Sequence, residues 1–368
     1  MNRLVRHVVC IGALLLLFIL FLLGCAEYPA EPSGAAPETE HPAVPDSEVI
    51  PDTTGDTFEA PVQETEVQLP TPEPTPAPTP EPTSAPTPTP APTPFTFLWI
   101  PDTQNYAWGS DEGLKAIVSY ALREKENLNI VAVVQTGDLV ENNALDAEWE
   151  KIRDCFEPLR GLIPFYCVCG NHDLGAGVGP DVIAARGYEQ YFKYDLCDVR
   201  EEEQRYHDGE CWYRFLDEQQ ILLLGIGWRL DKNTEERDEW VNSVLDAYSE
   251  YPAVIVTHGY LDDASLIASG ETLRKKVISK HTNVRLLLCG HRRGAVRTVT
   301  ENEDGSTFAA VMVNLQDERE WNTTGYCMLV TFDPLSRSIS FTNYSPVLDD
   351  YNYYNDPSKE TFTLENAY

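Results

Sequence analysis

Apolar runs that end in small clusters of polar residues recur along the chain from about residue 95 onward. The clearest case is the stretch Ile130–Asn142, which begins as a continuous run rich in β-branched residues and then reaches Gly137-Asp138. A run of this kind is typical of a central strand buried on both faces. Several of the runs are separated by stretches with apolar residues three and four positions apart, which predict amphipathic helices.

These two patterns predict an order of elements. Strands are expected at Phe95–Ile100, at the start of Ile130–Asn142, and at Phe165–Cys169, Trp212–Phe215, Ile221–Ile226, Ala253–Thr257 and Val284–Cys289. Helices are expected at Leu114–Glu126, Ala147–Leu159, Glu235–Tyr248 and Leu266–His281, the last interrupted at Gly270. The remaining runs are expected to form antiparallel strands without helices: Ala309–Leu315, Tyr326–Phe332 and Ser338–Thr342. Alternating strands and helices with a β-rich end indicate a layered α/β fold with mixed sheets.

The first 24 residues have the pattern of a secretion leader. Arg3 and Arg6 precede the apolar run Val8–Leu23, which closes with Gly24-Cys25. This ending resembles the bacterial lipoprotein signal, and for Cys25 it implies lipidation and a membrane anchor. An uncleaved single-span anchor is the alternative, because the apolar run is nearly long enough to cross a bilayer. Both alternatives predict that the rest of the chain lies on the extracytoplasmic face of a bacterial membrane.

Residues 26–94 are predicted to be a linker. They hold 19 of the 27 prolines, together with 13 acidic and no basic side chains. Such a composition cannot bury a core and favours extended polyproline II, which makes a semi-rigid spacer. The chain is therefore divided into a leader (1–24), a lipidated cysteine with a proline-rich linker (25–94) and one globular domain (95–368).

Charge and cysteine content narrow the partners and the redox chemistry. The formal net charge is -32, so a surface that binds nucleic acid is not expected. Seven cysteines follow Cys25, and an odd number does not suggest a complete disulfide framework. Four of them are interpreted as core residues, and a pairing of Cys197 with Cys211 stays open. The four are Cys167, Cys169, Cys289 and Cys327.

Polar side chains stand where five of the predicted strands end. They are Asp102 with Gln104, Asp138, Asn171-His172-Asp173, His258 and His291. The carboxyl ends of buried strands face the crevice in which open α/β sheets bind ligands. A single histidine at such a place is usually structural, but three of the seven histidines in this chain end apolar strands. Because Asp, Asn and His are ligands of hard and borderline divalent ions, the pattern predicts a metal centre.

Five blocks in this order resemble the calcineurin-like metallophosphoesterase superfamily. They are Asp102-Thr103-Gln104, Gly137-Asp138 with the residues up to Asn142, Gly170-Asn171-His172-Asp173, Thr257-His258, and Gly290-His291-Arg292-Arg293. The opening Pro-Asp-Thr-Gln and the region from Thr331 to Pro346 are similar to a secreted bacterial branch. The resemblance runs from Phe95 to the C-terminus. It implies a four-layer α/β/β/α sandwich with two mixed β-sheets.

The resemblance also implies two divalent metal ions, Mn, Fe or Zn, and a phosphomonoester or phosphodiester substrate. By resemblance Asp138 bridges the ions, Asp102 holds the first, and Asn171, His258 and His291 hold the second. Such a pair binds a phosphoryl oxygen and a water, and it lowers the water's pKa so that metal-bound hydroxide is available near neutral pH. His172 is then expected to stabilise the transition state or protonate the leaving oxygen, with Asp173 orienting it.

Two positions depart from the family pattern, and both serve the first ion. Gln104 stands where a histidine is usual, although its amide oxygen can still act as a ligand. Arg293 stands where a second histidine is usual and cannot be a ligand, but it can pair with a substrate phosphate. The first site is therefore predicted to be weakened. Asn142, with Glu141 and Gln316, is expected to face the same crevice. The stretches Gly175–Glu210 and Trp228–Trp240 are expected to shape its rim.

Three functions are compatible with these observations. The leading one is a membrane-anchored, extracytoplasmic phosphoesterase that depends on metal. The second is a binding module that keeps the fold but has lost catalysis, and the altered positions Gln104 and Arg293 motivate it. A glycosidase with paired carboxylates is the third and leaves the histidines unexplained.

Overall fold

The computed structural model describes residues 92–175, 188–193, 197–199, 201, 204–206, 211–228, 234–301, 306–316 and 323–368. All of them belong to the compact unit Ser84–Tyr368. The predicted leader, Cys25 and nearly all of the predicted linker lie outside the described residues. No helix in the described part is long and apolar enough to cross a bilayer.

The first sheet has six strands in the order β15-β14-β13-β1-β2-β3. Its strands are β1 (Phe95–Ile100), β2 (Ile130–Gln135), β3 (Phe165–Cys167), β13 (Cys327–Asp333), β14 (Ser338–Tyr344) and β15 (Thr361–Leu364). Strands β1, β2 and β3 are parallel, whereas β13 pairs antiparallel with β1, and β14 and β15 continue antiparallel. The sheet is therefore mixed.

The second sheet has seven strands in the order β11-β12-β10-β7-β6-β5-β4. They are β4 (Arg205–Tyr206), β5 (Cys211–Leu216), β6 (Ile221–Ile226), β7 (Ala253–Thr257), β10 (Val284–Cys289), β11 (Gly294–Glu301) and β12 (Thr307–Asn314). Strands β6, β7, β10 and β12 are parallel, and the strands at both edges are antiparallel. A separate small hairpin joins β8 (Leu261–Asp262) to β9 (Ser265–Leu266).

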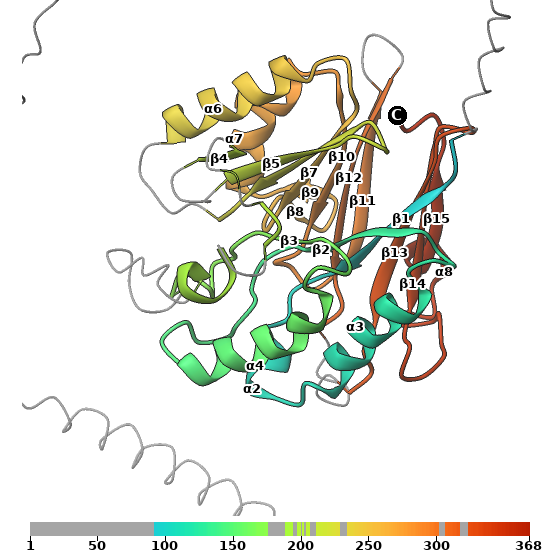
Figure 1. The fold of residues 1–368 in the computed structure, drawn as a ribbon. Helices are drawn as coiled ribbons and strands as arrows, with labels where there is room; N and C mark the ends of the chain where they lie inside the picture. The colour runs from blue at the N-terminus through green and yellow to red at the C-terminus, as the bar shows by residue number, and fades with distance from the viewer. Residues whose placement is uncertain are drawn as a thin grey trace, which may run out of the picture. The chain divides into compact units, whose positions relative to one another are not determined.

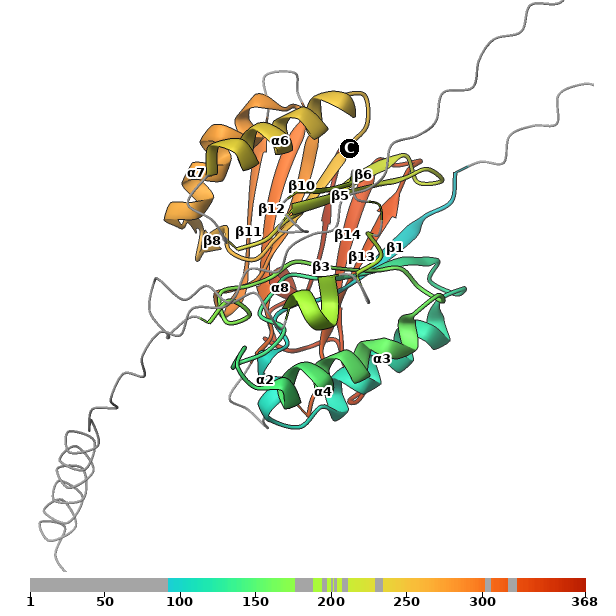
Figure 2. The ribbon, with the colours of Figure 1, turned by 60° about the vertical axis from the view of Figure 1, so that its left-hand side comes forward.

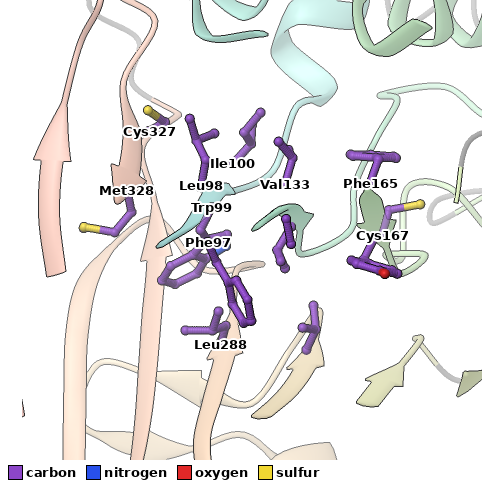
Figure 3. Packing of buried hydrophobic residues seen from close by; sticks show 14 of the residues in the cluster. Phe97, Leu98, Trp99, Ile100, Val133, Phe165, Cys167, Leu288, Cys327 and Met328 are labelled. Atoms are coloured by element: carbon purple, nitrogen blue, oxygen red, sulfur yellow. The ribbon is translucent and has the colours of Figure 1, made fainter. Parts of the chain in front are cut away.

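The two sheets pack face to face, and the alternation of side chains along each strand explains why. In β10, Leu286 and Leu288 enter the cluster shared with the first sheet, while Leu287 and Cys289 enter the cluster on the other face. Figure 3 shows the same alternation in β1, where the side chains of Leu98 and Ile100 point away from those of Phe97 and Trp99. These central strands are buried on both faces, as continuous apolar runs predict.

Helices cover the two outer faces. The second cluster packs the second sheet against α6 (Thr234–Ala247) and α7 (Ala268–Lys276). On the other side lie α2 (Gln104–Trp108), α3 (Glu112–Glu124) and α4 (Asp146–Phe156), next to the first sheet (Figures 1 and 2). The predicted α/β fold with two mixed sheets between helical layers is confirmed.

Several predicted details are corrected. Gly270 does not interrupt a helix but lies inside α7, where a Cβ would come within 2.3 Å of the Tyr260 carbonyl oxygen. The C-terminal region is not purely antiparallel or free of helices, because β12 pairs parallel with β10 and α8 (Pro357–Glu360) precedes β15. Strand β11 was not predicted, since Ala295 is its only buried residue. Short 3₁₀ segments follow α4 and α7, at Glu157–Leu159 and Ile278–Lys280, and the π-helical turn Glu189–Lys193 was not predicted.

The seven cysteines after Cys25 are all described, and all are buried and outside any disulfide. Cys197 and Cys211 therefore do not form the disulfide that the sequence left open. Cys167, Cys169, Cys289 and Cys327 are core residues, as predicted.

Trp212 of β5 connects the two sheets and gives a test of the packing. Its indole N–H donates to the carbonyl oxygen of Cys167 in β3 at 2.8 Å, and Gly225 of β6 lies against the ring. A Cβ at position 225 would come within 2.1 Å of the indole, so Gly225→Ala is expected to cost about 1–3 kcal/mol in the free energy of unfolding. Urea unfolding measures this. The control makes the same change in a Trp212→Phe background, which lacks the indole atoms that the added Cβ would meet; an equal loss in both backgrounds would contradict the packing.

Candidate metal centre

Strands of both sheets bring their carboxyl ends to one place. The first sheet contributes Asp102 after β1, Asp138 after β2 and Asn171 after β3. The second contributes His258 after β7 and His291 after β10, and β12 ends in Asn314. The amide nitrogen of Asn314 donates to Oδ2 of Asp102 at 2.6 Å, so the ends of the two sheets are in contact. All five strand-end clusters that the sequence singled out meet here.

The backbone at these strand ends is shaped for close approach. Gly137 has φ of +95°, and the residue after it, Asp138, is also left-handed with φ of +53°. Gly170 lies so near that a Cβ there would come within 2.2 Å of Oδ1 of Asp138. Its main chain can therefore pass directly beside the carboxylate, which accepts the backbone N–H of His172 at 2.9 Å.

His258 is the centre of a group of potential ligands. Its Nδ1 lies 2.9 Å from the carbonyl oxygen of Thr136, and donation to that oxygen leaves the lone pair on Nε2. Nε2 lies 3.2 Å from Oδ2 of Asp138, 2.9 Å from Oδ1 of Asn171 and 3.2 Å from Nδ1 of His291. The ligand atoms of Asp138, His258 and His291 all lie within 4.8 Å of one another.

This arrangement fits a divalent cation. The converging atoms are lone-pair donors, which repel one another unless a cation or a proton lies between them. Ligands held 2.0–2.2 Å from one ion at right angles are themselves about 3 Å apart, which matches the spacing around His258. A mixed nitrogen and oxygen set suits Mn, Fe or Zn. Asp138, Asn171, His258 and His291 thus fit the ion to which the sequence assigned them.

The charges in this group are strongly coupled. Burial alone would lower the pKa of His258, but the charge and hydrogen bond of Asp138 outweigh it and raise the pKa to about 9. Burial opposes the charge of Asp138, yet the neighbouring His258 holds the pKa of this carboxyl below its usual value. Burial and the charge of His258 lower the pKa of His291 to about 4, so its imidazole is neutral at neutral pH. A positive charge between Asp138 and His258, from a proton or a metal ion, is therefore favoured.

The side of the cluster predicted to hold the first ion is built differently. Burial and the charge of Asp138 raise the pKa of Asp102 to about 7. The backbone N–H of His291 contacts both Asp102 oxygens, at 3.2 and 3.0 Å. Gln104 donates from Nε2 to Oδ2 of Asp138 at 3.3 Å and accepts from Nε2 of Gln316 at 2.6 Å. Gln316, which was expected to face the crevice, thus contacts Gln104.

His172 is oriented by Glu141. Its Nδ1 lies 3.1 Å from the backbone oxygen of Glu141 and 3.3 Å from the Glu141 carboxylate. Burial would lower the pKa of His172, but the charges of Asp138 and Glu141 raise it. The carboxylate of Asp173 is fully buried and accepts the backbone N–H groups of Gly170 and Val140, at 2.7 and 3.1 Å. Glu141, and not Asp173 as predicted, therefore contacts and orients the His172 ring. Asp173 instead connects the segments that follow β2 and β3.

The two predicted substrate residues lie at the rim. Asn142 is exposed, and its side-chain oxygen accepts the N–H of Ala144 within its own loop. Arg293 is exposed as well, and its charge opposes the burial that raises the pKa of Glu141. Part of the segment predicted to shape the rim, Gly175–Glu210, lies outside the described residues.

Three residues of the site were not predicted. Asn314 lies inside the predicted strand Ala309–Leu315, so it was not recognised as the residue at which a strand ends. Glu148 of α4 is buried and accepts the backbone N–H groups of Glu141 and Asn142, both at 2.9 Å, which holds the loop beside His172. The ring of Trp228 lies against the two histidines, 5.5 Å from His258 and 4.9 Å from His291 between centroids. Of the three, only Trp228 belonged to a region that the sequence linked to the site, the predicted rim Trp228–Trp240. Its contact with the histidines was not predicted.

Gly170→Ala tests the geometry around Asp138. The added Cβ would lie 2.2 Å from the carboxylate and 2.3 Å from the backbone nitrogen of Asp138 and must displace both, so the affinity for Mn²⁺ is expected to fall about 10–100-fold. Isothermal titration calorimetry measures the affinity, and circular dichroism shows whether the variant is folded. Gly161→Ala is the control for metal affinity, because nothing lies within 4 Å of its added Cβ. An affinity equal to that of the wild type would show that Asp138 does not set the geometry of the ion.

The fold and this cluster together define a class of protein. Residues 95–292, more than half of the chain, match the family model for calcineurin-like phosphoesterases. The chain belongs to this family, whose members typically depend on two metal ions.

Among individual proteins, the chain is 28% identical over 288 residues to the uncharacterized protein YvnB of Bacillus subtilis (strain 168). The matched region covers 73% of this chain but 21% of YvnB, so the chain spans about a fifth of that relative's length. Purple acid phosphatase PPD1 from yellow lupin (Lupinus luteus) seeds has a similar structure, with a TM-score of 0.47, 13% identity and coverage of 74% and 54% of the two chains. The protein TT1561 of Thermus thermophilus has a TM-score of 0.44, 16% identity and coverage of 69% and 100%.

Proposed function

We propose that this chain is a metal-dependent phosphoesterase that hydrolyses a phosphomonoester or phosphodiester outside the cytoplasm. One observation carries the proposal: ligand atoms of Asp138, His258 and His291 converge within 4.8 Å at the strand ends of a calcineurin-like phosphoesterase domain. A glycosidase is not favoured, because Asp138 lies against two histidines rather than standing opposite a second carboxylate across a sugar site.

The residues of the chain have distinct roles in this reaction. A divalent ion bound at this cluster would supply charge stabilisation at the phosphoryl group and would activate a water. Asp138 and His258 would hold the ion, and the ring of Trp228 lies against His258 and His291. As the bond between phosphorus and the leaving oxygen breaks, His172 gives that oxygen a proton, and Glu141 holds the imidazole by its Nδ1. The products are an alcohol and a phosphate that carries the oxygen of water.

We place the enzyme at the membrane, anchored through Cys25. The leader and the proline-rich segment support this placement. Strand β1 adds to it, because Phe95 begins this six-residue strand and Asp102 follows its end. The chain upstream of Phe95 therefore joins the domain about 20 Å from the metal centre, at the opposite end of β1.

The test is metal removal from the full-length protein. Chelation is expected to abolish hydrolysis of an aryl phosphodiester, and titration with Mn²⁺, Zn²⁺ or Fe²⁺ is expected to restore it. An aryl phosphomonoester assayed in parallel shows which ester is preferred. A folded protein that hydrolyses neither ester with any of these ions would overturn the proposal.

A second candidate is a binding module that keeps the cluster without turnover. It is favoured by Gln104, whose amide oxygen is already engaged by Gln316 rather than free to bind an ion. Metal binding without hydrolysis in the same titration would support it.

A further inference from the structure

Side-chain amides contact the carboxylates of Asp102 and Asp138 and one another. Asn314 donates to Asp102, Gln104 donates to Asp138, and Gln316 donates to Gln104. Asn314 and Gln316 are buried, with 4% and 7% of their surfaces exposed. Hydrogen-bond donors therefore meet Asp102 and one oxygen of Asp138, whereas lone pairs converge around Nε2 of His258.

The orientation of Asn314 follows from its second contact. Its Oδ1 accepts the backbone N–H of Gln316 at 3.0 Å, so its amide nitrogen must be the atom that faces Asp102. An amide nitrogen has no lone pair for a metal. The backbone N–H of His291 contacts both oxygens of Asp102 as well. Neutral donors thus stabilise the charge of Asp102 from two directions.

Gln104 is held in the same way. Its oxygen, the only atom with which it can bind an ion, accepts from Gln316, and its nitrogen faces Asp138. To act as a ligand, Gln104 would have to break the 2.6 Å bond to Gln316 and turn a donor away from a buried carboxylate. Arg293, at the other altered position, has a side chain that cannot bind a cation.

We infer that this chain holds one resident divalent ion, on the Asp138, Asn171, His258 and His291 side, and that the amides of Gln104, Asn314 and Gln316 replace the second ion of its relatives. The inference rests on the proposed metal-dependent function. It concerns the number of ions and not whether a metal binds. The residues present do not fit a first ion: they supply hydrogen bonds to Asp102 and Asp138 where a cation would supply charge.

The experiment counts ions in the full-length protein. After chelation, reloading with Mn²⁺ and gel filtration, elemental analysis is expected to find one equivalent per chain. Electron paramagnetic resonance is expected to show the spectrum of isolated Mn²⁺ rather than that of a spin-coupled pair. Two tightly held equivalents with a coupled spectrum would overturn the inference and leave the proposed function standing. No bound metal at all would overturn both.

Gln104→Glu tests whether the amide is responsible. The change keeps the side-chain length, removes the donor to Asp138 and adds a carboxylate, so the variant is expected to bind a second equivalent about 10–100-fold more tightly than the wild type does. Gln104→His combined with Arg293→His restores both residues typical of the family and is expected to show the coupled spectrum. Gln220→Glu, an exposed position in the turn between β5 and β6, is the matched control. If both site variants still bind one equivalent, Gln104 does not set the number of ions and the inference fails.

Discussion

Asp138→Asn is expected to lower kcat/KM by roughly 10³-fold, which corresponds to about 4 kcal/mol of transition-state stabilisation. The substitution keeps the shape of the side chain, and its oxygen can still accept the N–H of His172. It removes the negative charge that lies 3.2 Å from Nε2 of His258. The ion would thereby lose its anionic ligand next to the two histidines. Initial rates on an aryl phosphodiester with saturating Mn²⁺ measure the loss.

The structure offers a closely matched control for this variant. Asp263 is exposed and, like Asp138, is a left-handed aspartate, with φ of +49° against +53°. Asparagine tolerates this conformation as well as aspartate does, so Asp263→Asn makes the same chemical change on a similar backbone. Its activity is expected to equal that of the wild type. If Asp138→Asn also retained activity within a few-fold, Asp138 would not hold the catalytic ion.

The carboxyl ends of the buried strands were the most predictable part of the molecule. The runs before Asp102, Asp138, His258 and His291 are predominantly apolar, as a strand buried on both faces requires. Each run stops at a polar residue, and parallel strands in one sheet end at one edge. At these strand ends the local sequence pattern was therefore sufficient to predict where in the fold the polar residues lie.

Other parts of the site had no local pattern from which to predict them. Asn314 meets Asp102 only because β12 pairs parallel with β10, and the direction of β12 depends on packing between segments far apart in the chain. Glu148 lies on a helix, and its role follows from where α4 packs beside the loop at Glu141. The contacts of Gln104 could not be inferred either, since the residue type alone allows a ligand or a donor.

His172→Gln is expected to lose activity to an extent that depends on the leaving group. If the imidazole protonates the leaving oxygen, an alkyl ester requires that proton and should react about 10²–10⁴-fold more slowly. A nitrophenyl ester, whose leaving oxygen is stable as an anion, should lose about tenfold or less. His281→Gln is the control for the loss of a histidine, because His281 contacts Asn242 and Asp246, which belong to α6 rather than to the centre.

The ratio of the two losses separates the roles that the sequence left open for His172. Equal losses on both esters would mean that the imidazole stabilises charge on the phosphoryl oxygens and transfers no proton. Glu141 distinguishes the roles further, since it contacts Nδ1 of His172 and leaves Nε2 to face the substrate. Glu141→Gln keeps the backbone contact to the ring but removes the carboxylate charge, so under the proton-transfer role it should slow the alkyl ester more than the nitrophenyl ester. A variant that slows both equally would assign Glu141, like His172, to charge stabilisation.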